Sequence, residues 1–174
     1  MYVKNLKFFV LLFLVNFLAC TPDQDIFNPD TNDHPIDVDS GTSDFQTAFL
    51  DAVNAYRTAG CKCGNKNMPP VAPLKWNSLL EEAATRHTND MASNEHFAHK
   101  GTDNSSIGQR IADTGYLWRA IGENIAFGYP NIQAVVDAWI ESEGHCKNIM
   151  NENFTEMGAA EKNSYWTQDL ARPQ

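Results

Sequence analysis

Apolar residues recur at three- and four-residue steps in several parts of this chain, which is the spacing of one face of a helix. In the first such segment Phe45, Phe49 and Val53 share a face, and Gly60 follows the last residue that fits the pattern. The helices predicted in this way cover residues 43–59, 77–93 and 105–114, and a fourth contains Ile132, Val135, Val136 and Trp139.

Shorter apolar runs bounded by turn residues predict strands in the second half of the chain. They cover residues 121–127, 157–161 and 165–170. Residues 61–73 contain Gly64 and three prolines, which predicts a loop. Helices that come early and strands that come late indicate an α+β domain, in which helices cover a small antiparallel sheet.

The first twenty residues carry an export pattern. Lys4 and Lys7 precede a short apolar run, and Ala19 stands before Cys20, which predicts a signal peptide over residues 1–19. The apolar run is too short for a comfortable transmembrane span. Ala19-Cys20 resembles a bacterial lipoprotein cleavage site, so we expect lipidation of Cys20 and attachment to a membrane of a bacterial cell envelope. An ordinary secreted protein and an uncleaved anchor are the alternatives.

The segment after the cleavage site is acidic, and it precedes a single domain. Residues 20–41 form the lipidated cysteine and a flexible linker, because the segment has too few large apolar residues to offset the entropy of ordering. Residues 42–174 suit one domain, which we expect to be a monomer. Removal of the leader takes away two lysines and no acid, so the formal charge changes from −9 to −11. This charge argues against nucleic acid or an anionic membrane face as a partner.

Three cysteines remain in the domain: Cys61, Cys63 and Cys146. Cys61 and Cys63 are too close in sequence to join without strain, so we expect a disulfide between Cys146 and one of these two. The alternative is a zinc site made of the three cysteines and His145, although Cys-x-Cys is tighter than the usual spacing of zinc ligands.

Two histidines and a carboxylate come from three separate segments with distinctive sequences. They are His99 in Phe97-Ala-His99, Glu123 in Gly122-Glu-Asn-Ile-Ala126, and His145 in Gly144-His145-Cys146. Such groups can bind a divalent metal, move protons or form hydrogen bonds with one another. His87 falls on the apolar face of a predicted helix, so we expect it in the core with its nitrogens satisfied. His96 is expected at the surface.

These segments belong to a longer series of motifs in a fixed order. The series is Pro73-Leu-Lys-Trp-Asn77, His87 with Asp90-Met91-Ala92, Phe97-Ala-His99, Gly115-Tyr116, Gly122-Glu-Asn-Ile-Ala126, Trp139, Gly144-His145-Cys-Lys-Asn-Ile149, Met157-Gly158 and Tyr165-Trp166-Thr167-Gln168. Over residues 45–170 the chain resembles the CAP superfamily (cysteine-rich secretory proteins, antigen 5 and pathogenesis-related 1, the SCP domain) in its bacterial form.

The resemblance implies a three-layer α-β-α sandwich around a small central antiparallel sheet, with a cleft that holds two histidines and two acidic residues. His99, Glu123 and His145 match three of these four positions. The second acid should follow Trp139 by three residues, where this chain has Ser142. If the helix continues, Glu143 lies on the same face as Trp139 and is the best substitute.

The cleft implies an exported binding module rather than an enzyme. His99 and His145 are the expected ligands of zinc or another divalent metal, and Glu123 fixes the tautomer of one imidazole. A hydrogen-bonded network that needs no metal is the other interpretation. The resemblance also implies lipids or sterols, glycans or partner proteins as ligands. The alternative function is a metal-assisted, peptidase-like hydrolase with Glu123 as general base.

Overall fold

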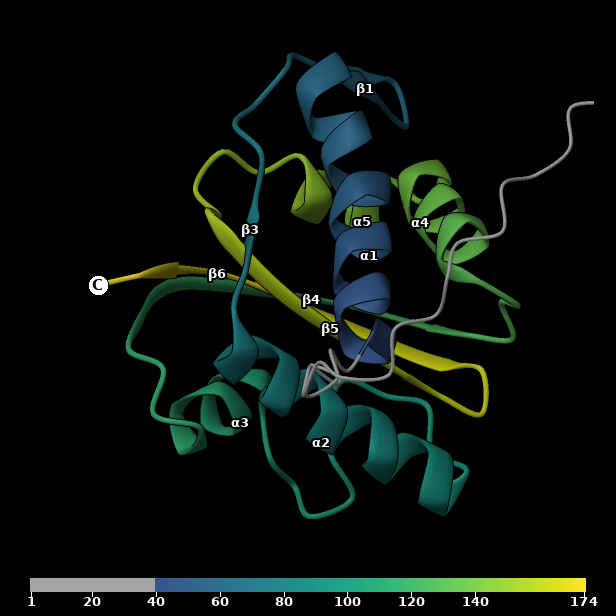
Figure 1. The fold of residues 1–174 in the computed structure, drawn as a ribbon, viewed down its shortest axis with the longest axis vertical. Helices are drawn as coiled ribbons and strands as arrows, with labels where there is room; N and C mark the ends of the chain where they lie inside the picture. Colours follow the sequence, from purple (N-terminus) through teal and green to yellow (C-terminus); the bar gives the residue numbers. More distant parts are fainter. Residues whose placement is uncertain (1–39) are drawn as a thin grey trace, which may run out of the picture. The chain divides into compact units, whose positions relative to one another are not determined.

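The computed structural model describes the backbone of residues 40–174 and the side chains from Asp44 onward (Figure 1). The predicted signal peptide, Cys20 and most of the acidic linker lie outside the described residues. Within the described part of the chain, no helix has both the length and the apolar character needed to cross a membrane.

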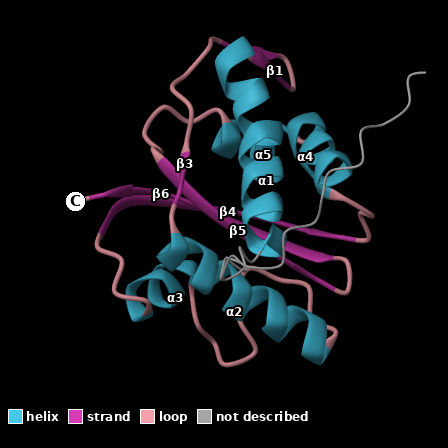
Figure 2. Cartoon of the chain, viewed as in Figure 1, coloured by secondary structure: helices cyan, strands magenta, loops and turns pink. Residues whose placement is uncertain are grey.

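A four-stranded sheet forms the centre of the domain (Figure 2). Its strand order is β3-β5-β6-β4, which leaves β4 at one edge; all pairs are antiparallel except the short pair of β3 with β5. The strand bounds are β3 Lys75–Trp76, β4 Trp118–Phe127, β5 Glu156–Lys162 and β6 Tyr165–Pro173. The last two strands form a hairpin whose turn residues, Asn163 and Ser164, have positive φ angles.

Helices cover both faces of this sheet, as Figure 1 shows, and this confirms the expected α+β fold in three layers. The layer on one face contains α1 (Ser40–Ala59), α4 (Ile132–Glu141) and α5 (Glu143–Ile149), and the layer on the other contains α2 (Ser78–Asn94) and α3 (Ile107–Asp113). In the larger core, Phe49 and Trp139 pack with their rings 6.1 Å apart over Trp166 and Leu170 of β6. A smaller core of Leu80, Ala83 and Ile111 lies beneath the second layer.

The second helical layer approaches the sheet closely at Gly158 of β5. A Cβ atom at this position would lie 2.1 Å from the backbone nitrogen of Glu81 in α2. Only a residue without a side chain allows the helix backbone to sit this near the strand. Asn77 begins α2 by accepting hydrogen bonds from the backbone N–H groups of Leu79 and Leu80. The cap at Asn77 and the close approach at Gly158 therefore fix the position of α2, which carries His87.

Arg57 of α1 is fully buried and connects α1 to two loops. Its guanidinium donates hydrogen bonds to the carbonyl oxygens of Ala72, Ile149, Asn151 and Phe154. Burial lowers the pKa of Arg57 to about 10, so the group is still cationic at neutral pH. Arg57 thus provides a donor for four backbone carbonyl groups.

Two local predictions differ from the structure. Residues 61–73 were expected to form a loop, but they contain a short hairpin of β1 (Cys61–Cys63) and β2 (Lys66–Met68). The helix that contains Trp139 does not continue to Glu143. It ends at Glu141, because Ser142 has extended backbone angles (φ −88°, ψ 117°), and α5 begins at Glu143.

Cys63 and Cys146 form a disulfide that connects the β1–β2 hairpin to α5. This confirms the expected bond to Cys146 and identifies Cys63 as its partner. Cys61 is a free thiol at the start of the same strand. A bond that closes a loop of this length stabilises a domain by roughly 4 kcal/mol in the chain-entropy account.

Candidate functional site

Glu123 lies at the centre of the candidate site, in the edge strand β4, and its side chain is only 3% exposed. One carboxylate oxygen accepts a hydrogen bond of 2.7 Å from Nδ1 of His99, and the other accepts one of 2.6 Å from Nη2 of Arg110. Burial alone would raise the pKa of Glu123. The hydrogen bond from His99 and the positive charge of Arg110 outweigh burial and lower this pKa, so the group is a carboxylate.

His99 belongs to the loop between α2 and α3, and its side chain is 59% exposed. A carboxylate can only accept, so Nδ1 of His99 carries the proton that is donated to Glu123. In the neutral ring Nε2 then has a free lone pair, which is the arrangement of a metal-binding histidine. The hydrogen bond to Glu123 raises the pKa of His99. Arg110 also donates to the backbone carbonyl of His99, at 3.1 Å, and so fixes the loop itself.

His145 approaches the same place from the other helical layer, on α5. Burial lowers the pKa of His145, and the charge of His99 lowers it further. Asn124 donates to the backbone carbonyl of His145 at 3.3 Å, and Asn148 donates to the backbone carbonyl of Glu123 at 3.2 Å. These bonds, together with the disulfide at Cys146, hold α5 against the edge of the sheet.

Glu143 does not lie in the cleft. Its exposed carboxylate accepts a hydrogen bond of 2.5 Å from Nζ of Lys147, which lowers its pKa, and it faces Gly64 of the hairpin. The expectation that Glu143 replaces the second acid depended on one continuous helix, and the break at Ser142 turns the side chain away. Ser142 itself lines an apolar groove that His145 also lines. Glu143 therefore does not supply the second acid of the expected cleft.

An open, mainly apolar groove of about 390 Å³ adjoins His145. Phe97 and Phe127 lie at its rim and are each more than half exposed, which is unusual for large apolar side chains in this domain. The groove is lined by Phe97, Ile125, Ala126, Phe127, Tyr129, Ala138, Trp139, Ser142 and His145.

Three buried polar residues near Glu123 were not identified, or not correctly described, from the sequence. Arg110 is one of them. It lies on the buried face of α3 with Ile107 and Ile111, and from this helical spacing its burial could have been predicted. His87 is buried as expected, but its ring nitrogens have no hydrogen-bond partner, and Nε2 lies 4.0 Å from the carboxylate of Glu123.

Asp169 of β6 is the third such residue and lies directly opposite Glu123 in the β4–β6 pair. It is fully buried, and neither of its carboxyl oxygens has a hydrogen-bond partner. Burial raises the pKa of Asp169 well above its ordinary value, and the charge of Glu123 adds to this effect. Burial and the charge of Glu123 therefore both favour the protonated form of Asp169.

The alternative zinc site of three cysteines and His145 is not formed. The sulfur atoms of Cys61, Cys63 and Cys146 do lie within 4.8 Å of one another, as a metal site would require. The bond between Cys63 and Cys146 leaves a single thiol, however, and His145 is not part of the group. His96 also lies outside the cleft, where its Nε2 meets the backbone carbonyl of Lys100 at 3.0 Å.

Comparison with known proteins places this geometry in a family. Residues 50–170 match the model of the cysteine-rich secretory protein family, called CAP. Two Bacillus subtilis proteins are similar: the uncharacterized protein YkwD is 34% identical over 128 residues (71% of this chain, 50% of the relative). The uncharacterized membrane protein YlbC is 32% identical over 102 residues (59% of this chain, 30% of the relative). This chain thus spans half or less of the length of these relatives.

Solved structures agree with this placement. An extracellular protein from Bacillus anthracis that contains an SCP domain superposes with a TM-score of 0.66 at 27% identity, over 80% of this chain and 45% of its own length. An outer surface protein from Borrelia burgdorferi gives 0.63 at 17% identity, over 76% of this chain and 96% of its own length, and supports the fold alone. On the family match over residues 50–170, the chain belongs to the cysteine-rich secretory protein (CAP) family.

Proposed function

We propose that this domain is an exported binding module whose cleft takes a divalent transition metal such as zinc through His99 and His145. The observation that supports this most directly is the 2.7 Å hydrogen bond from Nδ1 of His99 to Glu123. It fixes the tautomer in which Nε2 is free to bind a metal, and a carboxylate in this position also strengthens the imidazole as a ligand.

The donor set fits a borderline metal with open coordination positions. Two neutral imidazoles favour zinc and its neighbours over calcium or magnesium, which prefer oxygen ligands. We assign Glu123 the role of orienting His99 and not that of a ligand, because its two oxygens already accept from His99 and Arg110. Water or a bound molecule therefore supplies the remaining ligands, and the metal links that molecule to the domain.

The same contacts favour binding over the hydrolase alternative. A general base works best when its pKa lies near the working pH and when one oxygen can reach the water that it activates. The pKa of Glu123 is lowered, and both of its oxygens already accept short hydrogen bonds. Glu123 is therefore suited to orienting His99 rather than to accepting a proton from substrate.

The groove beside His145 bears on the class of ligand. Its lining is dominated by aromatic and aliphatic side chains, with Phe97 and Phe127 exposed at the rim. Burial of these side chains against a ligand favours binding when the ligand has an apolar group. Among lipids or sterols, glycans and proteins, this lining favours a lipid or a protein with an apolar side chain over a glycan.

A zinc titration of chelator-treated protein tests the metal site. If the histidines bind zinc, the melting temperature rises, and free zinc at about 100 times the dissociation constant stabilises the fold by about 2.7 kcal/mol. His99→Ala should abolish the rise. His96→Ala is the matched control, because His96 lies three residues away and outside the cleft. No rise in the wild type, or an equal rise in His99→Ala, would contradict the proposal.

Export and lipid anchoring form a separate part of the proposal. The leader pattern before Cys20 supports it, as do the Bacillus anthracis neighbour, described as extracellular, and the relative described as a membrane protein. Cells that express the full chain should incorporate labelled fatty acid into the wild type and not into Cys20→Ser. Equal labelling of the two proteins would contradict lipidation.

A further inference from the structure

The three cysteines of the domain form one cluster between the β1–β2 hairpin and α5. Cys61 and Cys63 are two residues apart in β1, so their side chains share one face of the strand. Cys63 is bonded to Cys146, and the free sulfur of Cys61 lies 3.6 Å from the sulfur of Cys146. A thiol in contact with a disulfide is the starting arrangement of thiol–disulfide exchange.

We propose that Cys61 exchanges with the Cys63–Cys146 disulfide, so that the domain exists as two disulfide isomers. The thiolate of Cys61 attacks Sγ of Cys146, and a Cys61–Cys146 bond forms. The bond between Cys146 and Cys63 breaks, its electron pair leaves on Cys63, and this sulfur takes up a proton. The number of thiols and disulfides is unchanged, so the step needs no oxidant or reductant.

Strand geometry directs the attack to Cys146 rather than to Cys63. A Cys61–Cys63 bond would have to span two residues of an extended strand, whose Cα atoms are about 6.7 Å apart, at the upper limit for a disulfide. It would also leave α5 without a covalent connection to the hairpin. Cys146 is therefore bonded in both isomers. The free thiol is on Cys61 in one isomer and on Cys63 in the other.

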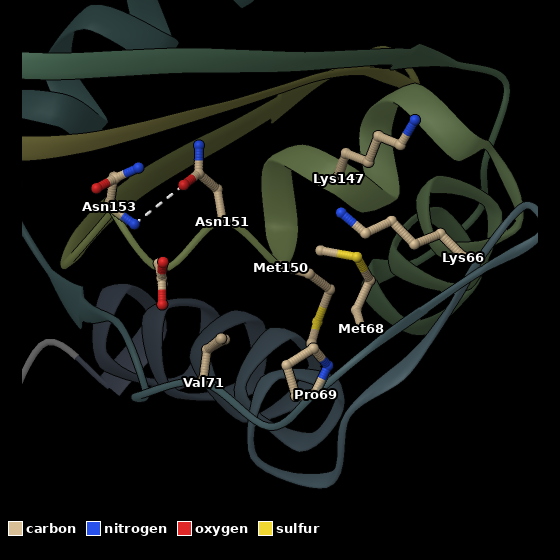
Figure 3. A pocket seen from close by; sticks show the side chains of 9 residues that line it. Lys66, Met68, Pro69, Val71, Lys147, Met150, Asn151 and Asn153 are labelled. Carbon is tan, nitrogen blue, oxygen red and sulfur yellow. Dashed lines mark hydrogen bonds between the residues drawn. The ribbon is translucent and has the colours of Figure 1, made fainter.

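Formation of the new bond requires only a small movement of Cys61. The sulfur of Cys61 must approach that of Cys146 by about 1.5 Å to reach bonding distance. An open hollow of about 380 Å³ lies between the hairpin and the end of α5, and Lys66, Met68, Lys147 and Met150 are among the residues that line it. Figure 3 shows these side chains. The free thiol is already in van der Waals contact with the disulfide, so a small shift of β1 is sufficient.

Exchange changes which free thiol is exposed to solvent, and it leaves the cleft unchanged. Cys61 is partly exposed, whereas Cys63 is fully buried. Small thiol-reactive molecules therefore meet the cluster at Cys61 and are excluded from it after exchange. Cys146 is bonded to β1 in both isomers, so α5 and the adjacent His145 stay attached to the hairpin. Burial raises the pKa of the Cys61 thiol, and exchange is consequently faster at alkaline pH.

Thiol mapping of the oxidised full chain tests the proposal, in a Cys20→Ser background so that only domain cysteines are counted. Samples are incubated over a range of pH, quenched in acid, unfolded and treated with a maleimide. Trypsin cleaves after Lys62 and separates the two candidate sites. We expect label on Cys63 to grow with time, at a rate that rises about tenfold per pH unit below the thiol pKa.

Two variants complete the experiment. Cys63→Ser should form a Cys61–Cys146 disulfide, and Cys61→Ser should keep Cys63–Cys146 and take up no label at any pH. Label confined to Cys61 in the oxidised chain at every pH and time would overturn the proposal, and so would two free thiols in a folded Cys63→Ser variant. If that variant fails to fold, the time course without it decides the question.

Discussion

Glu123 and Arg110 form a buried ion pair, with Oε2 of the carboxylate 2.6 Å from Nη2 of the guanidinium and both side chains almost completely buried. The second oxygen of the same carboxylate accepts from His99. One buried charge pair therefore positions an exposed imidazole. The ion pair therefore connects the interior of the domain to the exposed His99. Replacement of Glu123 should change both the stability of the domain and the pKa of His99.

Glu123→Gln should destabilise the domain and loosen His99. The variant leaves the guanidinium of Arg110 buried without its counter-charge, and breaking a buried pair in this way costs about 3–5 kcal/mol. It also replaces the carboxylate, whose hydrogen bond and charge raise the pKa of His99, with a neutral amide, so this pKa should fall. Urea denaturation measures the first effect and an NMR titration of the His99 ring measures the second. An unchanged pKa of His99 would show that the hydrogen bond is absent in solution.

The pH dependence of stability should separate His99 from His145. The folded-state pKa of His99 is raised, so its contribution is fully present below the unfolded pKa of about 6.5 and is lost as pH rises through the folded value. The melting temperature of the wild type should therefore exceed that of His99→Ala most at mildly acidic pH, and the difference should shrink toward alkaline pH.

His145→Ala should show the opposite trend. The folded-state pKa of His145 is lowered, so its protonation favours the unfolded chain, and the wild type loses stability relative to this variant as pH falls below about 6.5. Melting curves of the three proteins across this range, without metal, make the comparison. Parallel pH profiles for both variants would contradict the assigned environments.

Arg57→Met should cost about 3–5 kcal/mol of the free energy of unfolding, because it leaves buried carbonyl groups without a donor. Arg86→Met is the matched control. Arg86 makes ion pairs with Asp103 and Asp113, but all three side chains are substantially exposed, and such pairs contribute less than about 1 kcal/mol. Equal losses in the two variants, measured by urea denaturation, would contradict a structural role of the buried guanidinium.

The sequence allowed prediction of the elements with strong periodicity. The helices over 43–59 and 77–93 and the paired strands over 157–161 and 165–170 are present within a few residues of their expected bounds. Residues 61–73 were misjudged, because proline and glycine also occur in short hairpins. Which of Cys61 and Cys63 binds Cys146 was not predictable either, since both lie on the same face of β1 and only packing against α5 distinguishes them.

The sequence allowed prediction of those site residues that belong to the recognised motifs. His99, Glu123 and His145 were named from the sequence. The structure joins His99 to Glu123 by a hydrogen bond, and Asn124, the residue after Glu123, donates to the backbone carbonyl of His145. Arg110 and Asp169 were missed because a charged residue in a short helix or strand is expected at the surface. Asp169 is buried only because β6 is covered on both faces, which is a property of the assembled domain. The break at Ser142 could not be predicted from the apolar spacing either, because the positions of Trp139 and Glu143 also fit one continuous helix.

That break leads to a last prediction, which concerns the missing acid. Ser142 lines the apolar groove together with His145, whereas Glu143 faces Lys147 and the hairpin. Ser142→Glu should therefore place a carboxylate next to the two imidazoles and provide a third metal ligand, as in many zinc sites. We expect zinc affinity to rise at least about tenfold, equivalent to 1.4 kcal/mol, as measured by calorimetric titration.

Glu143→Gln is the control for this gain, because it changes the neighbouring acid without altering the cleft. Its zinc affinity should equal that of the wild type. Loss of affinity in Glu143→Gln would mean that this carboxylate reaches the metal after all. If Ser142→Glu binds zinc no better than the wild type, the two imidazoles do not share a metal, and the hydrogen-bonded network without metal is then the better description of the cleft.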